Sequence, residues 1–186
     1  MKGFVGAQYK AFGSIAEATK ALDGRYEDYQ GRGSSPGKWR WARTKPQIPS
    51  VCVDAACSGS PGRLEYRGVL TDSGQQLFRS GPFADGTNNV GEFLAIVDAL
   101  RWLRDHRHTW PLYSDSENAI GWVRAGKCRT KLRRTPSNRR IFEMIAKAED
   151  ELQGISASKT ILRANQQILK WQTAEWGEIP ADFGRK

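Results

Sequence analysis

Four acidic residues stand where the surrounding sequence predicts burial or the end of a secondary-structure element: Asp54, Glu92, Asp115 and Asp182. Asp54 follows the short, β-branched run Val51–Val53, which predicts a buried strand. A carboxylate among buried apolar neighbours is costly unless it is paired or binds a metal. Divalent ions such as Mg²⁺ take oxygen ligands, and two of them about 4 Å apart can assist phosphodiester hydrolysis. The set therefore predicts a metal-dependent nuclease.

Each of these acids, taken singly, has a plainer explanation. Glu92 opens a predicted helix, and Asp115 directly follows a predicted strand. Asp182 falls in the first turn of a terminal helix that we expect to start at Pro180, since proline suits that position. Acidic side chains stabilise helix N-termini without any metal. Only the four together indicate a metal site.

The composition favours a folded protein with a polyanionic partner. The chain has 186 residues, enough for one domain with a sizeable core and a small appendage. Its net charge of +9 favours nucleic acid as the partner, although a basic surface kept for solubility would give the same charge. No apolar window predicts a membrane span, no signal peptide is recognisable, and the 3 cysteines do not form a disulfide framework. We therefore expect a cytoplasmic protein without a membrane partner.

Apolar periodicity predicts the elements that position the acids. Strands are expected over residues 50–57, 64–71, 75–80 and 110–114, and a last one within 160–171. Helices are expected with an apolar stripe over 93–103, from Ser116, over 138–152, and at the C-terminus. A loop is expected over 82–89. This order predicts an α/β fold, with a mixed sheet and helices packed on its faces. Ligand sites in such sheets lie at the carboxyl ends of strands.

The N-terminal part of the chain is interpreted as a small unit followed by a linker. Residues 1–22 predict a strand and a short helix, with Ser14 and Glu17 as a capping box. Residues 23–48, rich in Gly, Ser, Pro and charge, predict a linker. Within it, Trp39–Arg40–Trp41 either anchors the linker to the domain that follows, which we favour, or stacks on bases. The main domain is then expected over 49–186.

Residues 50–186 resemble type 1 ribonuclease H through motifs in the family's order. These motifs are Val53–Asp54 followed by Cys57–x–Gly59–x–Pro61–Gly62, then Thr87–Asn88–Asn89–x–x–Glu92, then Tyr113–Ser114–Asp115–Ser116, and finally Ala181–Asp182. The stretch from Trp176 to Lys186 is similar to the subgroup that carries an N-terminal viroplasmin-like domain. The pattern Gly-Ala-x-Tyr-Lys-x-Phe near the start resembles the second half of that domain, so we interpret residues 1–22 as a partial viroplasmin-like unit.

The resemblance implies a ribonuclease H-like fold: a five-stranded mixed sheet flanked by helices, with the first and fourth strands adjacent. It implies an endoribonuclease that hydrolyses the RNA strand of RNA–DNA hybrids and leaves 5′-phosphate and 3′-hydroxyl ends. The catalytic and metal-binding residues would be Asp54, Glu92, Asp115 and Asp182, with two Mg²⁺ or Mn²⁺ ions per site. We expect a monomer. The alternative is a non-catalytic binder of RNA-containing duplexes, which would have no use for acids that repel phosphate.

The resemblance also implies substrate contacts from Ser60, Thr87, Asn88 and Asn89. The two asparagines would lie in the minor groove, where 2′-hydroxyls distinguish RNA from DNA. Residues 118–142 hold many basic side chains, among them Arg133 and Arg134, with no acid between Asn118 and Phe142. This segment either contacts phosphates, which we favour, or is a solvated helix end and loop.

One departure from the family concerns a histidine before the last aspartate. Many type 1 relatives carry it, but this chain has no histidine after His108. Glu178 lies in the corresponding stretch, and we predict an auxiliary role for it with the second metal or in product release. A plain N-terminal charge for the terminal helix is the alternative.

Overall fold

The computed structural model describes Ile15, Thr19, and residues 37–154 and 166–184. Contacts divide the chain into two units, residues 1–32 and 33–186. In the first unit, Ile15 and Thr19 are helical, as their spacing predicts. The predicted capping box and the viroplasmin-like pattern lie outside the described residues. The rest of the description concerns the second unit.

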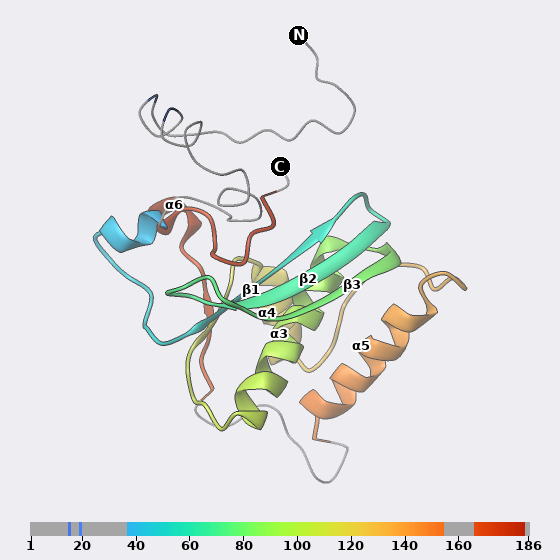
Figure 1. The fold of residues 1–186 in the computed structure, drawn as a ribbon. Helices are drawn as coiled ribbons and strands as arrows, with labels where there is room; N and C mark the ends of the chain where they lie inside the picture. Colours follow the sequence, from blue (N-terminus) through green and yellow to red (C-terminus); the bar gives the residue numbers. More distant parts are fainter. Residues whose placement is uncertain (1–14, 16–18, 20–36, 155–165, 185–186) are drawn as a thin grey trace. The chain divides into compact units, whose positions relative to one another are not determined.

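A five-stranded mixed sheet forms the centre of the second unit (Figure 1). Its strands are β1 (Val51–Cys57), β2 (Gly62–Leu70), β3 (Gln76–Gly86), β4 (Leu112–Ser114) and β5 (Ile168–Lys170). Their spatial order is β3-β2-β1-β4-β5. The pairs β1–β2 and β2–β3 are antiparallel, while β1–β4 and β4–β5 are parallel. The predicted fold class is therefore confirmed, including the adjacency of the first and fourth strands.

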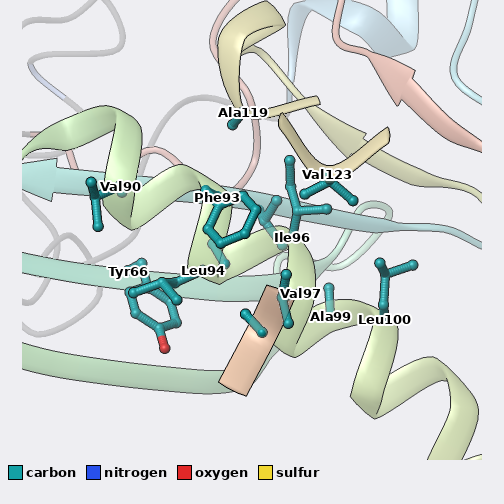
Figure 2. Close-up of a cluster of buried hydrophobic side chains, with 14 of the residues drawn as sticks. Tyr66, Val90, Phe93, Leu94, Ile96, Val97, Ala99, Leu100, Ala119 and Val123 are labelled. Carbon is teal, nitrogen blue, oxygen red and sulfur yellow. The ribbon is translucent and has the colours of Figure 1, made fainter. Parts of the chain in front are cut away.

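The helices complete the fold around this sheet. They are the short 3₁₀ helix η1 (Lys38–Trp41) and the helices α3 (Asn88–Asp105), α4 (Glu117–Arg124), α5 (Arg139–Leu152) and α6 (Thr173–Trp176). Helix α3 contacts β1 and β2 of the sheet, and also α4 and α5. Its predicted apolar stripe is buried, and Figure 2 shows Phe93, Ile96 and Leu100 among these side chains. No helix among the described residues has the length and apolarity needed to cross a bilayer.

Strand β3 is longer than its sequence predicts. The loop expected over 82–89 is wrong except at Thr87, because β3 continues to Gly86 and α3 begins at Asn88. Pro82 and neighbouring glycines hide this continuation. The pairing with β2 shifts register between Gly62 and Leu64 and again before Tyr66, and such irregularities accommodate residues that regular strands exclude.

The predicted terminal helix is also wrong for the described residues. Pro180 and Ala181 lie in a turn, and no helix is assigned over 177–184. Gly184 has a φ of 64°, a left-handed conformation that glycine adopts readily and that leads the chain out of a helix. Asp182 therefore belongs to an irregular segment instead of a helix N-terminus.

A second, smaller core anchors residues 37–48 to the sheet. Trp39 is 7% exposed and packs with the side chains of Cys52, Val69, Tyr113, Trp171, Trp176, Ile179 and Ala181. The backbone and hydroxyl of Thr44 donate to the two carboxylate oxygens of Glu175 at 2.7 and 2.8 Å. The predicted anchoring role is thus confirmed for Trp39, whereas Trp41 is 84% exposed.

Candidate active site

Three of the four predicted acids meet where the carboxyl end of β4 lies beside the middle of β1. Asp54 lies in β1, and Asp115 directly follows β4, which runs parallel beside β1. Glu92 lies near the start of α3, the helix that packs on β1. One carboxylate oxygen from each of these acids lies within 4.8 Å of the others. Because β1 and β4 are adjacent and parallel, Asp54 and Asp115 lie close together at the carboxyl end of β4 although they are distant in the sequence.

The electrostatics of this group are unfavourable without a cation. The pKa of Asp54 is raised from 3.8 to about 8, chiefly by burial and also by the charges of Asp115, Asp182 and Glu92, while a backbone hydrogen bond from Ala55 opposes the shift. Burial likewise raises the pKa of Glu92; the Ser116 hydroxyl opposes this shift, and Asp115 adds to it. Carboxylates this close resist ionising together, so a positive charge between them would be strongly favoured.

The hydrogen bonding of Glu92 is also consistent with a cation site. Its Oε1 accepts a 2.8 Å hydrogen bond from Nδ2 of Asn88. Its Oε2 is buried and has no hydrogen-bond partner among the described residues. Buried polar atoms without a partner are rare and mark strain, function or an absent ion. An oxygen-only donor set with one unsatisfied carboxylate oxygen fits a hard divalent cation.

Asp182 is not a member of the close carboxylate group, although its charge raises the pKa of Asp54. Its own Oδ1 accepts a 2.6 Å hydrogen bond from the backbone of Gly184. Arg67 ties this segment to the sheet, because its guanidinium donates to the carbonyl of Ala181 at 2.8 Å and to the carbonyl of Asp182. Arg67 is the register partner of Asp54 across β1 and β2, so both side chains leave the same face.

Sequence reasoning missed Arg67. Arg67 is paired with Asp54 by the register of β1 against β2. The sequence of the turn between these strands did not fix that register, so the pairing could not be predicted.

Several predicted substrate residues line a common groove of about 640 Å³. Ser60, Thr87, Asn89 and Arg133 are among its lining residues. Sequence reasoning did not single out four of the others for substrate contact: Trp122, Thr130, Leu132 and Asn138. Asn88 lies in an adjoining depression of about 250 Å³ that again includes Ser60, Thr87 and Asn89.

Besides Asp182, two predicted residues lie outside these two depressions and the carboxylate group. Arg134 does not line the groove; its guanidinium lies 5.1 Å from the ring centre of Phe142. Glu178 is exposed and is not a member of the close carboxylate group. With no terminal helix in the described residues, Glu178 also does not serve as an N-terminal charge for one.

Asn138 shapes the basic wall of the groove. Only 1% of this residue is exposed. Its Oδ1 accepts a 2.8 Å hydrogen bond from the backbone of Thr135, and its Nδ2 donates to the carbonyl of Arg133 at 2.9 Å. The loop that carries Arg133 is therefore held in a defined conformation, which its irregular, basic sequence did not predict.

Comparison with known proteins gives this site a family context. The sequence model of the RNase H family matches residues 47–181. The chain is 33% identical over 105 residues to a ribonuclease H of Nitratidesulfovibrio vulgaris strain DP4, covering 52% of this chain and 66% of that protein. It is 35% identical over 102 residues to the ribonuclease H of strain Miyazaki F, covering 50% and 64%. The chain thus spans slightly less than two thirds of the length of these curated relatives.

Solved structures are more distant in sequence. RNase H1 of Halobacterium salinarum NRC-1 is 21% identical, with a TM-score of 0.42 over 67% of this chain and 86% of that one. LC11-RNase H1 in complex with an RNA/DNA hybrid is 21% identical, with a TM-score of 0.40 over 68% and 87%. The match of the family model covers well over half of the chain and spans strands β1 to β5, helices α3 to α6 and the groove described above. The chain therefore belongs to the RNase H family.

Proposed function

We propose that this protein is a type 1 ribonuclease H, an endoribonuclease that hydrolyses the RNA strand of RNA–DNA hybrids and leaves 5′-phosphate and 3′-hydroxyl ends. The observation that carries the proposal is the close group of Asp54, Glu92 and Asp115, in which Asp54 and Glu92 are buried and one carboxylate oxygen of each acid lies within 4.8 Å of the others. Membership of the RNase H family and the relatives named ribonuclease H support it.

In this proposal Asp54, Glu92, Asp115 and Asp182 hold two divalent cations, Mg²⁺ or Mn²⁺. Such ions, when bound, activate water and stabilise charge on the leaving oxygen of a phosphodiester. The chain supplies the oxygen ligands and their orientation. Asn88 fixes the Glu92 carboxylate through its 2.8 Å hydrogen bond, so that Oε2 remains available.

The groove is suited to a polyanion with a ribose strand. Arg129, Lys131 and Arg133 contribute positive charge to one wall, and Ser60 and Thr87 contribute hydroxyl groups elsewhere in it. Basic side chains bind phosphates without regard to sequence. The amides of Asn88 and Asn89 can donate to and accept from 2′-hydroxyl groups, which RNA has and DNA lacks.

Glu178 is proposed as an auxiliary residue for the second metal or for product release, in keeping with its exposure in the segment that precedes Asp182. We expect Glu178→Gln to lower turnover several-fold while leaving hybrid affinity unchanged. Steady-state rates over a Mg²⁺ titration test this role, and identical curves for the variant and the wild type would contradict it.

The decisive experiment uses the full chain with end-labelled RNA–DNA hybrid, RNA–RNA duplex and DNA–DNA duplex in parallel, with and without Mg²⁺. We expect metal-dependent cleavage of the RNA strand of the hybrid alone, with 3′-hydroxyl product ends that a polymerase can extend. Asp54→Asn, an isosteric change that removes one charge, is the matched inactive control. Equal cleavage of all three duplexes would reject the specificity, and tight binding without cleavage would favour the non-catalytic binder.

A further inference from the structure

The stretch Lys38–Lys45 forms an exposed basic surface around one exposed tryptophan. We call it the Trp41 surface and define it by the exposed residues Lys38, Arg40, Trp41, Arg43 and Lys45. Trp41 is 84% exposed, whereas the other tryptophan of η1, Trp39, is 7% exposed. Tryptophan is normally mostly buried, so a residue this exposed on a folded element calls for an explanation.

The backbone beneath Trp41 is fixed to the domain. Trp39 packs into the small core with Trp171 and Trp176, and η1 lies beside α6 (Figure 1). The two hydrogen bonds from Thr44 to Glu175 hold the far end of the stretch. The exposed indole is therefore presented on an ordered scaffold, which lowers the entropic cost of binding a ligand through it.

The charged side chains within the stretch are all basic, and one acid from elsewhere in the chain, Glu175, lies against it, where hydrogen bonds from Thr44 and the charge of Arg43 lower the pKa of its carboxyl. The stretch contains no acid, and no ion pair that the structure describes within 4 Å involves its four basic residues. Arg40 is engaged locally, since it donates to the carbonyl of Asp72 and lies 4.8 Å from the ring centre of Trp39. Lys38, Arg43 and Lys45 extend the positive surface on both sides of Trp41.

We propose that the Trp41 surface binds an unpaired nucleic-acid strand. The indole stacks on a base, and the flanking cations contact the phosphates on either side. An aromatic platform within a positive surface is the usual arrangement for binding single strands without sequence preference. In a blunt duplex the bases are stacked on one another, so none of them is available to stack on the Trp41 indole. This surface shares no residue with the groove near the carboxylates, so its binding does not depend on hydrolysis.

The test measures fluorescence anisotropy of labelled single strands of about ten nucleotides, RNA and DNA in separate arms, with the full chain in EDTA. Trp41→Leu keeps an apolar side chain but removes the aromatic face, and Trp41→Phe keeps a smaller one. We expect Trp41→Leu to weaken binding about tenfold, as the loss of one base stack implies, and Trp41→Phe to recover part of that loss. A blunt hybrid should bind both variants equally.

The double variant Lys38→Gln/Lys45→Gln tests whether the basic residues of the Trp41 surface contact phosphates. Each lost phosphate contact should reduce the slope of log affinity against log salt by about 0.7 for a single strand. Arg107→Gln, which removes one charge at an exposed arginine beyond the end of α3, is the control for charge lost elsewhere and should leave the slope unchanged. Equal single-strand affinity of Trp41→Leu and the wild type would overturn the proposal. A changed sedimentation coefficient of Trp41→Leu without a change in affinity would instead assign the surface to contact between two copies of the chain.

Discussion

At the scale of single residues, Asp54 carries the largest electrostatic cost in the candidate site. The residue is 7% exposed, and the pKa of its carboxyl is raised to about 8. In the unfolded chain this group ionises near pH 4, so between about pH 4 and pH 8 the folded state binds more protons than the unfolded state. The free energy of unfolding of the metal-free protein must then fall as the pH rises through this window.

Asp54→Asn should therefore stabilise the metal-free protein at pH 8 by a few kcal/mol, since each pKa unit corresponds to about 1.4 kcal/mol. At pH 4 the substitution should change the free energy of unfolding little. Urea unfolding in EDTA at several pH values measures this free energy for both proteins. Adding Mg²⁺ should stabilise the wild type at pH 8 more than the variant. A variant with the same pH dependence of stability as the wild type would show that Asp54 does not carry this cost.

Arg67 is predicted to act through Asp182. It donates to the carbonyls of Ala181 and Asp182, and its guanidinium lies 4.8 Å from the ring centre of Phe183. Arg67→Met should therefore release the segment that carries Asp182 and lower both Mg²⁺ affinity and turnover about tenfold or more. Lysine can still donate to one carbonyl, so Arg67→Lys should recover part of the loss.

A double-mutant cycle separates this positioning role from a general loss of stability. If Arg67 acts through Asp182, Arg67→Met should cost little more Mg²⁺ affinity when Asp182→Asn is already present. Calorimetry of Mg²⁺ binding and thermal unfolding of the same four proteins give the two readouts. Independent, additive losses in affinity would contradict the positioning role.

At the scale of elements, the start of α3 must approach the sheet closely to bring Glu92 beside Asp54. Gly91 makes this approach: a Cβ built on it would lie 2.5 Å from Cδ1 of Leu64 and 2.7 Å from Cβ of Ala55. The Leu64 side chain can rotate, but the Cβ of Ala55 moves only with the backbone of β1. The separation of α3 from β1 is thus set by the absence of one methyl group.

Gly91→Ala should destabilise the protein by about 1–3 kcal/mol through overpacking and weaken Mg²⁺ binding, because α3 must shift away from Asp54. Gly121→Ala in α4 is the matched control. A Cβ there meets nothing within 4 Å, so replacing a helical glycine should stabilise by about 0.5–1 kcal/mol. Chemical denaturation of both variants tests this, and a neutral Gly91→Ala would refute the close-approach argument.

Elements with strong local signals were predictable, and those set by long-range contacts were not. The apolar run of β1 and the apolar stripe of α3 were enough to predict both elements, and with them the positions of Asp54 and Glu92. The continuation of β3 to Gly86 depends on register shifts against β2, which no local pattern encodes. The turn at Pro180 and Ala181 is held by Arg67, which lies 114 positions before Ala181 in the chain, so a terminal helix was a reasonable but wrong prediction.

At the scale of the whole molecule, the net charge of +9 draws polyanions towards the protein but does not say which cations bind them. The structure distinguishes Arg133 from Arg134, two adjacent arginines for which the sequence predicts the same role. Arg133 lines the groove, and its carbonyl accepts from the buried Asn138. Arg134 does not line the groove and lies over the Phe142 ring instead. Only one of these two adjacent arginines is therefore in place to contact a strand bound in the groove.

This predicts that Arg133→Gln lowers the slope of log hybrid affinity against log salt by about 0.9, the loss of one phosphate contact on a duplex, whereas Arg134→Gln changes it much less. Titrations of an uncleavable hybrid in EDTA at several salt concentrations measure both slopes, with the two neighbouring substitutions serving as controls for each other. Since both variants lose the same unit of charge, a difference between them can come only from where each arginine lies. Equal slopes for the two variants would mean that the overall charge of the protein, and not the groove, governs hybrid binding.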